Sequence, residues 1–206
     1  MRKMADCCES AACSLLQSER QRTTLRIVLA INGVMFVAVL SAGLLAGSTA
    51  LMADSLDNLG DALTYALSLW AVSRGASAKA RVALFKGALI LAAGLFVLGA
   101  VAWRAAFPAL PSAQAMGAMS VLALAANGTC LALLHRHRAE DVNMSSVWEC
   151  ARNDIASNLA VLVAAGGVWL TSSGWPDLAA GLALAALLLW SAGRVVRASA
   201  QSLRRL

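Results

Sequence analysis

The sequence predicts an all-α integral membrane protein built as a bundle of six transmembrane helices. Of its 206 residues, 60% are hydrophobic and only 14% are charged, whereas soluble domains average about 45–50% apolar and about 25% charged residues. The chain contains six apolar stretches of about 20 residues, the length that crosses a hydrocarbon core about 30 Å thick. Basic residues gather next to alternate stretches, as they do in membrane proteins. These observations exclude an ordinary soluble enzyme.

The predicted spans follow one another with short connections. They cover about residues 25–46, 49–72, 82–103, 115–134, 146–170 and 175–195. The first span is too long for a signal-peptide core and leads directly into more membrane-like sequence, so we expect it to stay uncleaved. Pro108 and Pro111 break the chain between the third and fourth spans. Pro176 is tolerated in the first turn of the sixth span.

The basic residues predict the orientation of the bundle. Of the 17 lysines and arginines, all except Arg104 and Arg152 lie on the side of the two termini when six spans alternate across the membrane. The positive-inside rule therefore places both termini in the cytoplasm. We expect a cytoplasmic, cysteine-containing tail over residues 1–24, a transmembrane domain over 25–197 and a short cytoplasmic C-terminus over 198–206.

The second span carries acids at membrane depth. Asp57 and Asp61 are four residues apart, so both carboxylates lie on one helix face, about 6 Å apart along the axis. Asp54 lies one turn earlier. At about 1.5 Å per residue from Thr49, where the span begins, Asp57 and Asp61 lie about 12–18 Å inside the membrane. Each charge costs about 2.5–3.5 kcal/mol at the bilayer centre. The alternative is a structural role, in which these acids pair between helices or with Arg152. One arginine cannot neutralise so many carboxylates, however.

The fifth span offers a second set of donors. Cys150 and Asp154 are also four residues apart, and Asn158 follows one turn later. Two helices that each present such a pair can converge on one tetrahedral cation. Mixed oxygen and sulfur donors suit Zn²⁺ or Cd²⁺ better than Mg²⁺ or Ca²⁺, which prefer six or more oxygens. The sequence therefore predicts a metal site made of Asp57, Asp61, Cys150 and Asp154.

Three segments resemble those of the cation diffusion facilitator family. The second span reads ADSLDNLGD over residues 53–61, the fifth reads CARNDIASN over 150–158, and Trp-Pro-Asp opens the sixth at 175–177. The resemblance extends over about residues 25–197. It implies that Asp57 and Asp61 form the transport-site pair and that Asp154 and the residue four positions before it complete the ligands.

The same resemblance implies a function. Members of the family are antiporters that export divalent metal from the cytoplasm in exchange for protons. We therefore expect Zn²⁺, Cd²⁺ or Co²⁺ as the transported substrate, with no cofactor and no nucleic-acid partner. We also expect a homodimer in the bacterial inner membrane. The chemistry agrees, because protons and a dication compete for the oxygens of closely spaced carboxylates.

The chain departs from the family pattern in two places. Cys150 stands where the family has His or Asp, and a softer thiolate favours thiophilic ions. The sequence leaves open whether Cys150, Glu149 or water completes the site. Only about ten residues follow the sixth span, so we expect the family's cytoplasmic metal-sensing domain, and regulation through it, to be lacking.

Other residues admit two interpretations. Cys7, Cys8 and Cys13 either capture a soft metal or are unpaired thiols in a tail. His135 and His137 either bind metal before it enters the transport site or belong to a loop whose basic residues only set the orientation. Arg152 is expected to be a counter-ion for Asp154 or Glu149, and Cys130 to be a packing residue.

Two alternative functions are a membrane metal sensor that does not transport, and a thiol oxidoreductase using the tail cysteines. The oxidoreductase lacks the expected CxxC pair. The sequence also contains no phosphate-binding loop and no nucleophile beside a base, so we expect neither an enzyme nor an ATP-driven pump.

Overall fold

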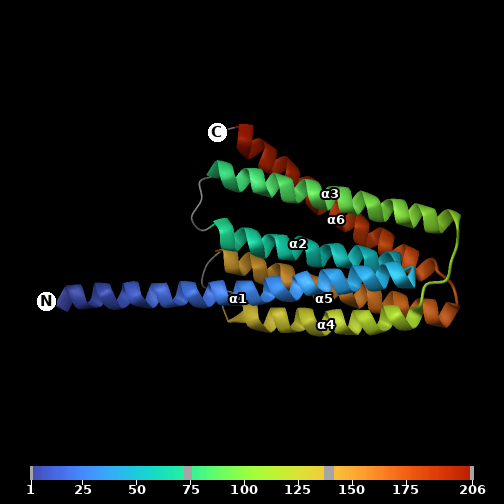
Figure 1. Cartoon of the computed structure of the whole chain (residues 1–206), viewed down its shortest axis with the longest axis horizontal. Coiled ribbons are helices and arrows are strands. Elements are labelled where there is room, and N and C mark those ends of the chain that lie inside the picture. Colours follow the sequence, from blue (N-terminus) through green and yellow to red (C-terminus); the bar gives the residue numbers. More distant parts are fainter. Residues whose placement is uncertain (1, 72–75, 137–141, 205–206) are drawn as a thin grey trace.

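The computed structural model describes residues 2–71, 76–136 and 142–204. Within these ranges it leaves aside the side chains of residues 2–18, 68, 70–71, 76–83, 86, 142–147, 149–150, 153, 195 and 198–204. All regular secondary structure in the described chain is helical, as the sequence predicts. Its helices are α1 (Arg2–Ala46), α2 (Thr49–Ala71), α3 (Ala76–Ala106), α4 (Ala113–His135), α5 (Val142–Thr171) and α6 (Trp175–Arg204). They run up and down the bundle, so α1 begins and α6 ends near the same end (Figure 1).

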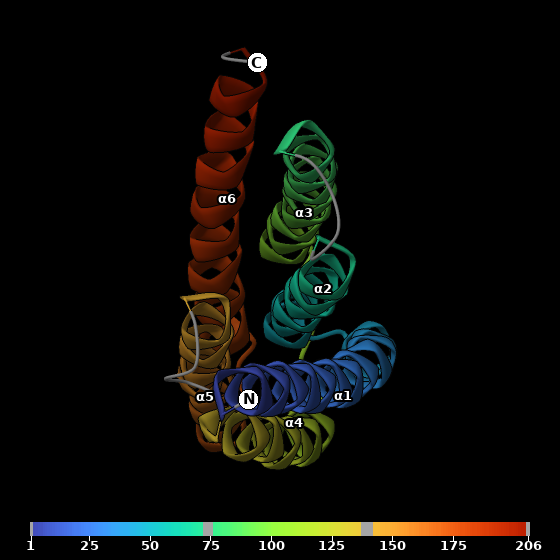
Figure 2. The same cartoon turned by 90° about the vertical axis from the view of Figure 1, so that its left-hand side faces the viewer.

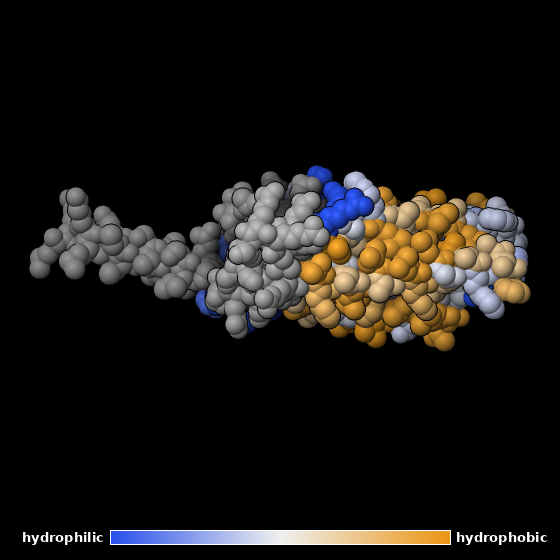
Figure 3. Space-filling model, turned by 90° about the horizontal axis from the view of Figure 1, so that it is seen from above, coloured by the Kyte–Doolittle hydropathy of each residue, from blue (hydrophilic) through white to orange (hydrophobic). Residues whose placement is uncertain are grey.

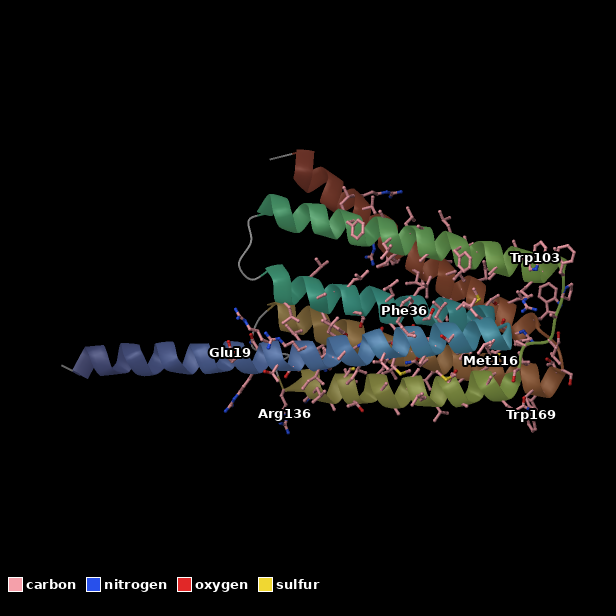
Figure 4. All side chains as sticks on the ribbon, viewed as in Figure 1. Glu19, Phe36, Trp103, Met116, Arg136 and Trp169 are labelled. Carbon is pink, nitrogen blue, oxygen red and sulfur yellow. The ribbon has the colours of Figure 1, made fainter. Side chains whose placement is uncertain are left out.

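The bundle has the surface of an integral membrane protein. Five helices are long and apolar enough to cross a bilayer, over Glu19–Ala46, Gly87–Ala106, Ala113–His135, Asp154–Thr171 and Trp175–Arg194. The visible surface is mostly hydrophobic over its middle and more hydrophilic toward its ends (Figure 3). Trp103 and Trp169 lie at the end opposite Glu19 and Arg136 (Figure 4). Aromatic residues at one boundary and charged residues at the other are typical of membrane interfaces.

The first helix is longer than the predicted span. It runs without a break for 45 residues, about 68 Å at about 1.5 Å per residue, which is more than twice the thickness of a hydrocarbon core. Its first half projects beyond the other helices (Figure 1). The predicted tail over residues 2–24 therefore continues the helix of the first span.

The second helix occupies the centre of the bundle. It packs against each of the other five helices. Viewed along the bundle, α1, α2, α4 and α5 lie close together, whereas α3 and α6 form a pair to one side (Figure 2). Among the described residues, α2 is not one of the helices apolar enough to cross a bilayer by composition alone. Its central position shields its three acids from lipid.

The turn between α1 and α2 lies at the end of the bundle far from the termini. Gly47 has a φ of +65°, a left-handed conformation that glycine adopts without strain. The guanidinium of Arg104 lies against Gly47, where any side chain would collide with it. The Ser112 amide also donates to the Ala46 carbonyl at 3.2 Å. The predicted turn at Gly47 and Ser48 is confirmed, and it is fixed by residues from α3 and the α3–α4 loop.

A buried carboxylate ties α6 to the start of α2 at the same end. Asp177 is only 2% exposed. It accepts hydrogen bonds from the Ser48 hydroxyl at 2.5 Å, the Thr49 amide at 2.8 Å, the Thr49 hydroxyl at 2.9 Å and the Ala50 amide at 3.1 Å. A carboxylate is the favoured partner for the free amides of a helix N-terminus. Gly181 allows the close approach, since a Cβ there would lie 2.6 Å from the Thr49 hydroxyl oxygen.

We predict that Asp177→Ala destabilises the whole bundle. The variant leaves the Ser48 and Thr49 donors without their acceptor, at an expected cost of about 2 kcal/mol or more. That cost corresponds to a fall of roughly 4–8 °C in the unfolding temperature of a chain of this size. Thermal unfolding in detergent measures the effect.

Asp177→Asn keeps one acceptor oxygen and should give an intermediate value. Glu19→Gln, on the exposed part of α1, should leave the unfolding temperature unchanged. An Asp177→Ala protein as stable as the parent would contradict the assignment.

Candidate functional site

The acids of α2 face the interior of the bundle at three successive turns. Asp54 is 2% exposed and Asp61 is 8% exposed, whereas Asp57 between them is half-buried. The hydroxyl of Ser157, on α5, forms a hydrogen bond with Asp57. The helix spacing that the sequence predicts therefore aligns these acids toward a neighbouring helix rather than toward lipid.

Two carboxyl groups meet between α2 and α5. The carboxyl groups of Asp61 and Asp154 lie within interaction range of each other. Two carboxylates have only acceptors, so a proton or a cation is needed for such a pair to attract each other. The predicted convergence of the second and fifth spans is therefore present in the structure.

A tyrosine holds one member of this pair. Tyr65 is completely buried, and its hydroxyl donates to Asp61 Oδ2 at 2.7 Å. The two residues are four positions apart on α2, so they share a helix face. Sequence reasoning missed Tyr65, although its spacing from Asp61 would have revealed it.

Two of the acids, Asp57 and Asp154, line a cavity that extends along α6. Its volume is about 510 Å³, and Asp57, Ser157 and Asp154 form one side of it. Small residues such as Ala180 and Ala183 line the opposite side, on α6. The lining continues to Trp190 and Arg194, toward the end of the bundle where the chain terminates. The Arg194 guanidinium stacks over the Trp190 ring at 4.0 Å from its centre.

Several buried polar atoms around the acids lack a protein partner in the described part of the chain. They are Asp54 Oδ2, Asn58 Oδ1 and both amide atoms of Asn158. Buried polar atoms of this kind are normally satisfied by ordered water or by an ion. The polar interior of α2 and α5 therefore has the capacity to solvate a cation or a proton.

The structure places the predicted ligands as follows. Asp57, Asp61 and Asp154 lie on the facing helices α2 and α5, as expected. Cys150 and Glu149 belong to α5, but their side chains lie outside the described residues. Among the side chains that are described, no three His, Cys, Asp or Glu residues are close enough to hold one metal ion. A bound cation would therefore have to draw the three carboxylates closer or recruit a further donor.

The other candidate residues have different surroundings. Arg152 is exposed, and its guanidinium lies 5.5 Å from the centre of the Trp148 ring. His135 is exposed and makes an edge-on contact with the same ring at 6.3 Å. Cys7, Cys8, Cys13 and His137 lie outside the residues whose side chains are described. The roles expected for these residues stay predictions.

The chain matches a known protein family. Residues 25–204 match the family described as the cation efflux transmembrane domain. The match begins within α1 and includes all of α2 and α5, which carry the acids. No curated protein matches the chain significantly.

We predict that Tyr65→Phe lowers the affinity of the site for Zn²⁺ by about tenfold. The change keeps the ring but removes the donor that orients Asp61, and loss of such a supporting hydrogen bond typically costs 10–100-fold in metal affinity. Isothermal titration calorimetry of the protein in detergent gives the affinity.

Thr64→Val is the matched control. It removes the neighbouring hydroxyl, which donates to the Gly60 carbonyl of its own helix at 2.8 Å. Equal affinities for Tyr65→Phe and Thr64→Val would show that Tyr65 does not support the site.

Proposed function

Because the chain belongs to the cation efflux family, we propose that it is a proton-coupled antiporter that exports Zn²⁺ or Cd²⁺ from the cytoplasm. The family is one of cation transporters rather than enzymes, and the chain is an integral membrane protein of that type. The proposal assigns the transport site to Asp57, Asp61, Asp154 and Cys150, on α2 and α5. It also includes a homodimer formed through the membrane helices, in the bacterial inner membrane.

The closely spaced pair of Asp61 and Asp154 carries the proposal. The oxygens that could share a proton between α2 and α5 are the same oxygens that would bind a metal. A dication that enters the site must displace that proton, and returning protons must displace the metal. One pair of carboxyl groups thus supports an exchange in which metal and protons move in opposite directions.

The cavity supports the proposed direction. It reaches from Asp57 and Asp154 to Arg194, toward the end of the bundle where both termini lie. The charge pattern of the sequence assigns that end to the cytoplasm. A cation would therefore enter from the cytoplasm, bind between α2 and α5, and leave on the opposite side.

A membrane metal sensor that does not transport is the second candidate. It would bind metal through the same carboxylates but would not need a cavity extending to one end of the bundle. Flux measurements separate the two functions, because a sensor binds the cation without moving it.

We predict that Asp61→Asn abolishes metal uptake driven by a pH gradient. The amide keeps the size of the side chain but cannot exchange a proton for a metal. Inside-out membrane vesicles with an acidic interior and external Zn²⁺ or Cd²⁺ provide the measurement, since export then appears as uptake.

Glu19→Gln, an exposed acid outside the bundle interior, should retain full uptake. Uptake by Asp61→Asn at the parental rate would rule out the proposed exchange. Binding without uptake in the parent protein would favour the sensor.

We also predict that Cys150→His shifts the preference from Cd²⁺ toward Zn²⁺, by about tenfold in the ratio of uptake rates. Imidazole is a harder donor than thiolate, so it weakens the site more for the softer ion. Parallel vesicle assays with the two metals measure the ratio. An unchanged ratio would show that Cys150 is not a ligand and would leave Glu149 or water in that position.

A further inference from the structure

An arginine lines the same cavity as two of the acids. Asp57 and Asp154 form part of its wall from α2 and α5, and Arg194 forms part of it from α6. Asp154 lies 17 residues from the C-terminal end of α5 and Arg194 lies 19 residues from the N-terminal end of α6, so each is about 25–28 Å along its helix from the turn that joins them. A cation that enters by this cavity therefore meets a guanidinium, which is positively charged at every physiological pH.

The guanidinium of Arg194 is held by an aromatic ring rather than by an acid. Its central carbon lies 4.0 Å from the centre of the Trp190 ring, one turn earlier on α6. Both side chains are exposed, and both belong to the cavity wall. Among the described residues, no carboxylate lies within ion-pair distance of Arg194, so none neutralises its charge directly. That charge therefore acts on whatever enters the cavity.

The wall between the arginine and the acids is apolar. On α6, the lining from Ala180 to Leu188 consists of alanine and leucine side chains. Charges in an apolar cavity interact more strongly and are screened less than charges on an open surface. An arginine beside a membrane pathway opposes the entry of cations. The repulsion from Arg194 and the attraction from the carboxylates thus act on the same ion within one cavity.

We propose that Arg194 tunes the affinity of the transport site by placing a fixed positive charge in the entry cavity of the cation. The guanidinium opposes the approach of the dication, whereas the carboxylates of Asp57 and Asp154 attract it. Binding is then strong enough for capture and weak enough for release, a balance that every transport pathway requires. The inference rests on the proposed function, since it concerns how tightly the same site holds its cargo.

A charge has properties that a metal ligand or a packing contact lacks. It acts equally on Zn²⁺ and Cd²⁺ because both are dications, whereas a ligand distinguishes hard ions from soft ones. Its effect declines as salt is added. Lysine preserves the charge, although it lacks the planar guanidinium. Removing Arg194 should also strengthen binding, which the loss of a structural contact would not do.

Isothermal titration calorimetry with Zn²⁺ and with Cd²⁺ at low salt measures the affinity. The sample is the purified full chain in detergent, with Cys7, Cys8 and Cys13 replaced by alanine so that their thiols do not compete. We expect Arg194→Gln to bind both metals about tenfold more tightly, and Arg194→Lys to stay close to the parent. Arg197→Gln is the matched control, because Arg197 is exposed one turn further along α6 and does not belong to the described cavity lining. It should also stay close to the parent.

Ionic strength provides the second part of the test, with a salt whose anion does not bind the metals. Between about 10 mM and about 1 M salt, the screening distance falls from about 30 Å to about 3 Å. The gain in Arg194→Gln should therefore shrink to less than about twofold at high salt. Arg194→Met, which removes the charge with a different side chain, should behave in the same way. Parental affinity of both neutral variants at low salt, or a gain for only one of the two metals, would overturn the inference.

Vesicle uptake measures the consequence for transport. Arg194→Gln should reach half-maximal uptake at about tenfold lower Zn²⁺ and should have a lower maximal rate, because protons displace a tightly held cation less readily. Arg197→Gln should leave both quantities unchanged. A half-saturating concentration in Arg194→Gln equal to that of the parent would contradict the assignment.

The measurements separate this inference from the proposed function. If the parent takes up metal and neither neutral variant of Arg194 binds it more tightly, the inference fails and the antiporter stands. If both neutral variants bind metal more tightly but the parent moves none, the effect of the charge on the site stands and the antiporter fails.

Discussion

The rest of the structure depends on the cost of placing carboxyl groups inside a membrane. The acids of α2 cannot face lipid, so that helix must lie where other helices and polar side chains surround it. It accordingly packs against all five other helices, and its acids meet Ser157 and Asp154 on α5. The central position of α2 follows from its acids, and the arrangement of the other helices follows from the need to shield them.

The helices are held together more firmly at one end of the bundle than at the other. At the end far from the termini, Asp177 binds the start of α2 and the turn at Gly47 contacts Arg104, so α1, α2, α3 and α6 are held together. Toward the other end, a cavity separates part of α6 from the acid-bearing faces of α2 and α5. A bundle fixed at one end and open toward the other can change which side reaches its centre by moving the α3–α6 pair.

The acids of α2 have hydroxyl partners on two helices. Tyr65 donates to Asp61 from α2 itself, whereas Ser157, a partner of Asp57, belongs to α5. A movement of α5 relative to α2 would therefore alter the surroundings of Asp57 while leaving the bond between Tyr65 and Asp61 in place.

The sequence alone determined the helices, their order and the faces on which the acids lie, because hydrophobic length and helical spacing are local properties. The break at Pro108 and Pro111 and the turn at Gly47 were predictable in this way. The helical conformation of the predicted tail was not expected, because α1 continues through residues 2–24. Only the tertiary structure showed that Asp177 caps α2 and that Asp61 lies near Asp154. Those contacts join residues more than 90 positions apart on different helices, and no spacing within one helix encodes how the helices pack.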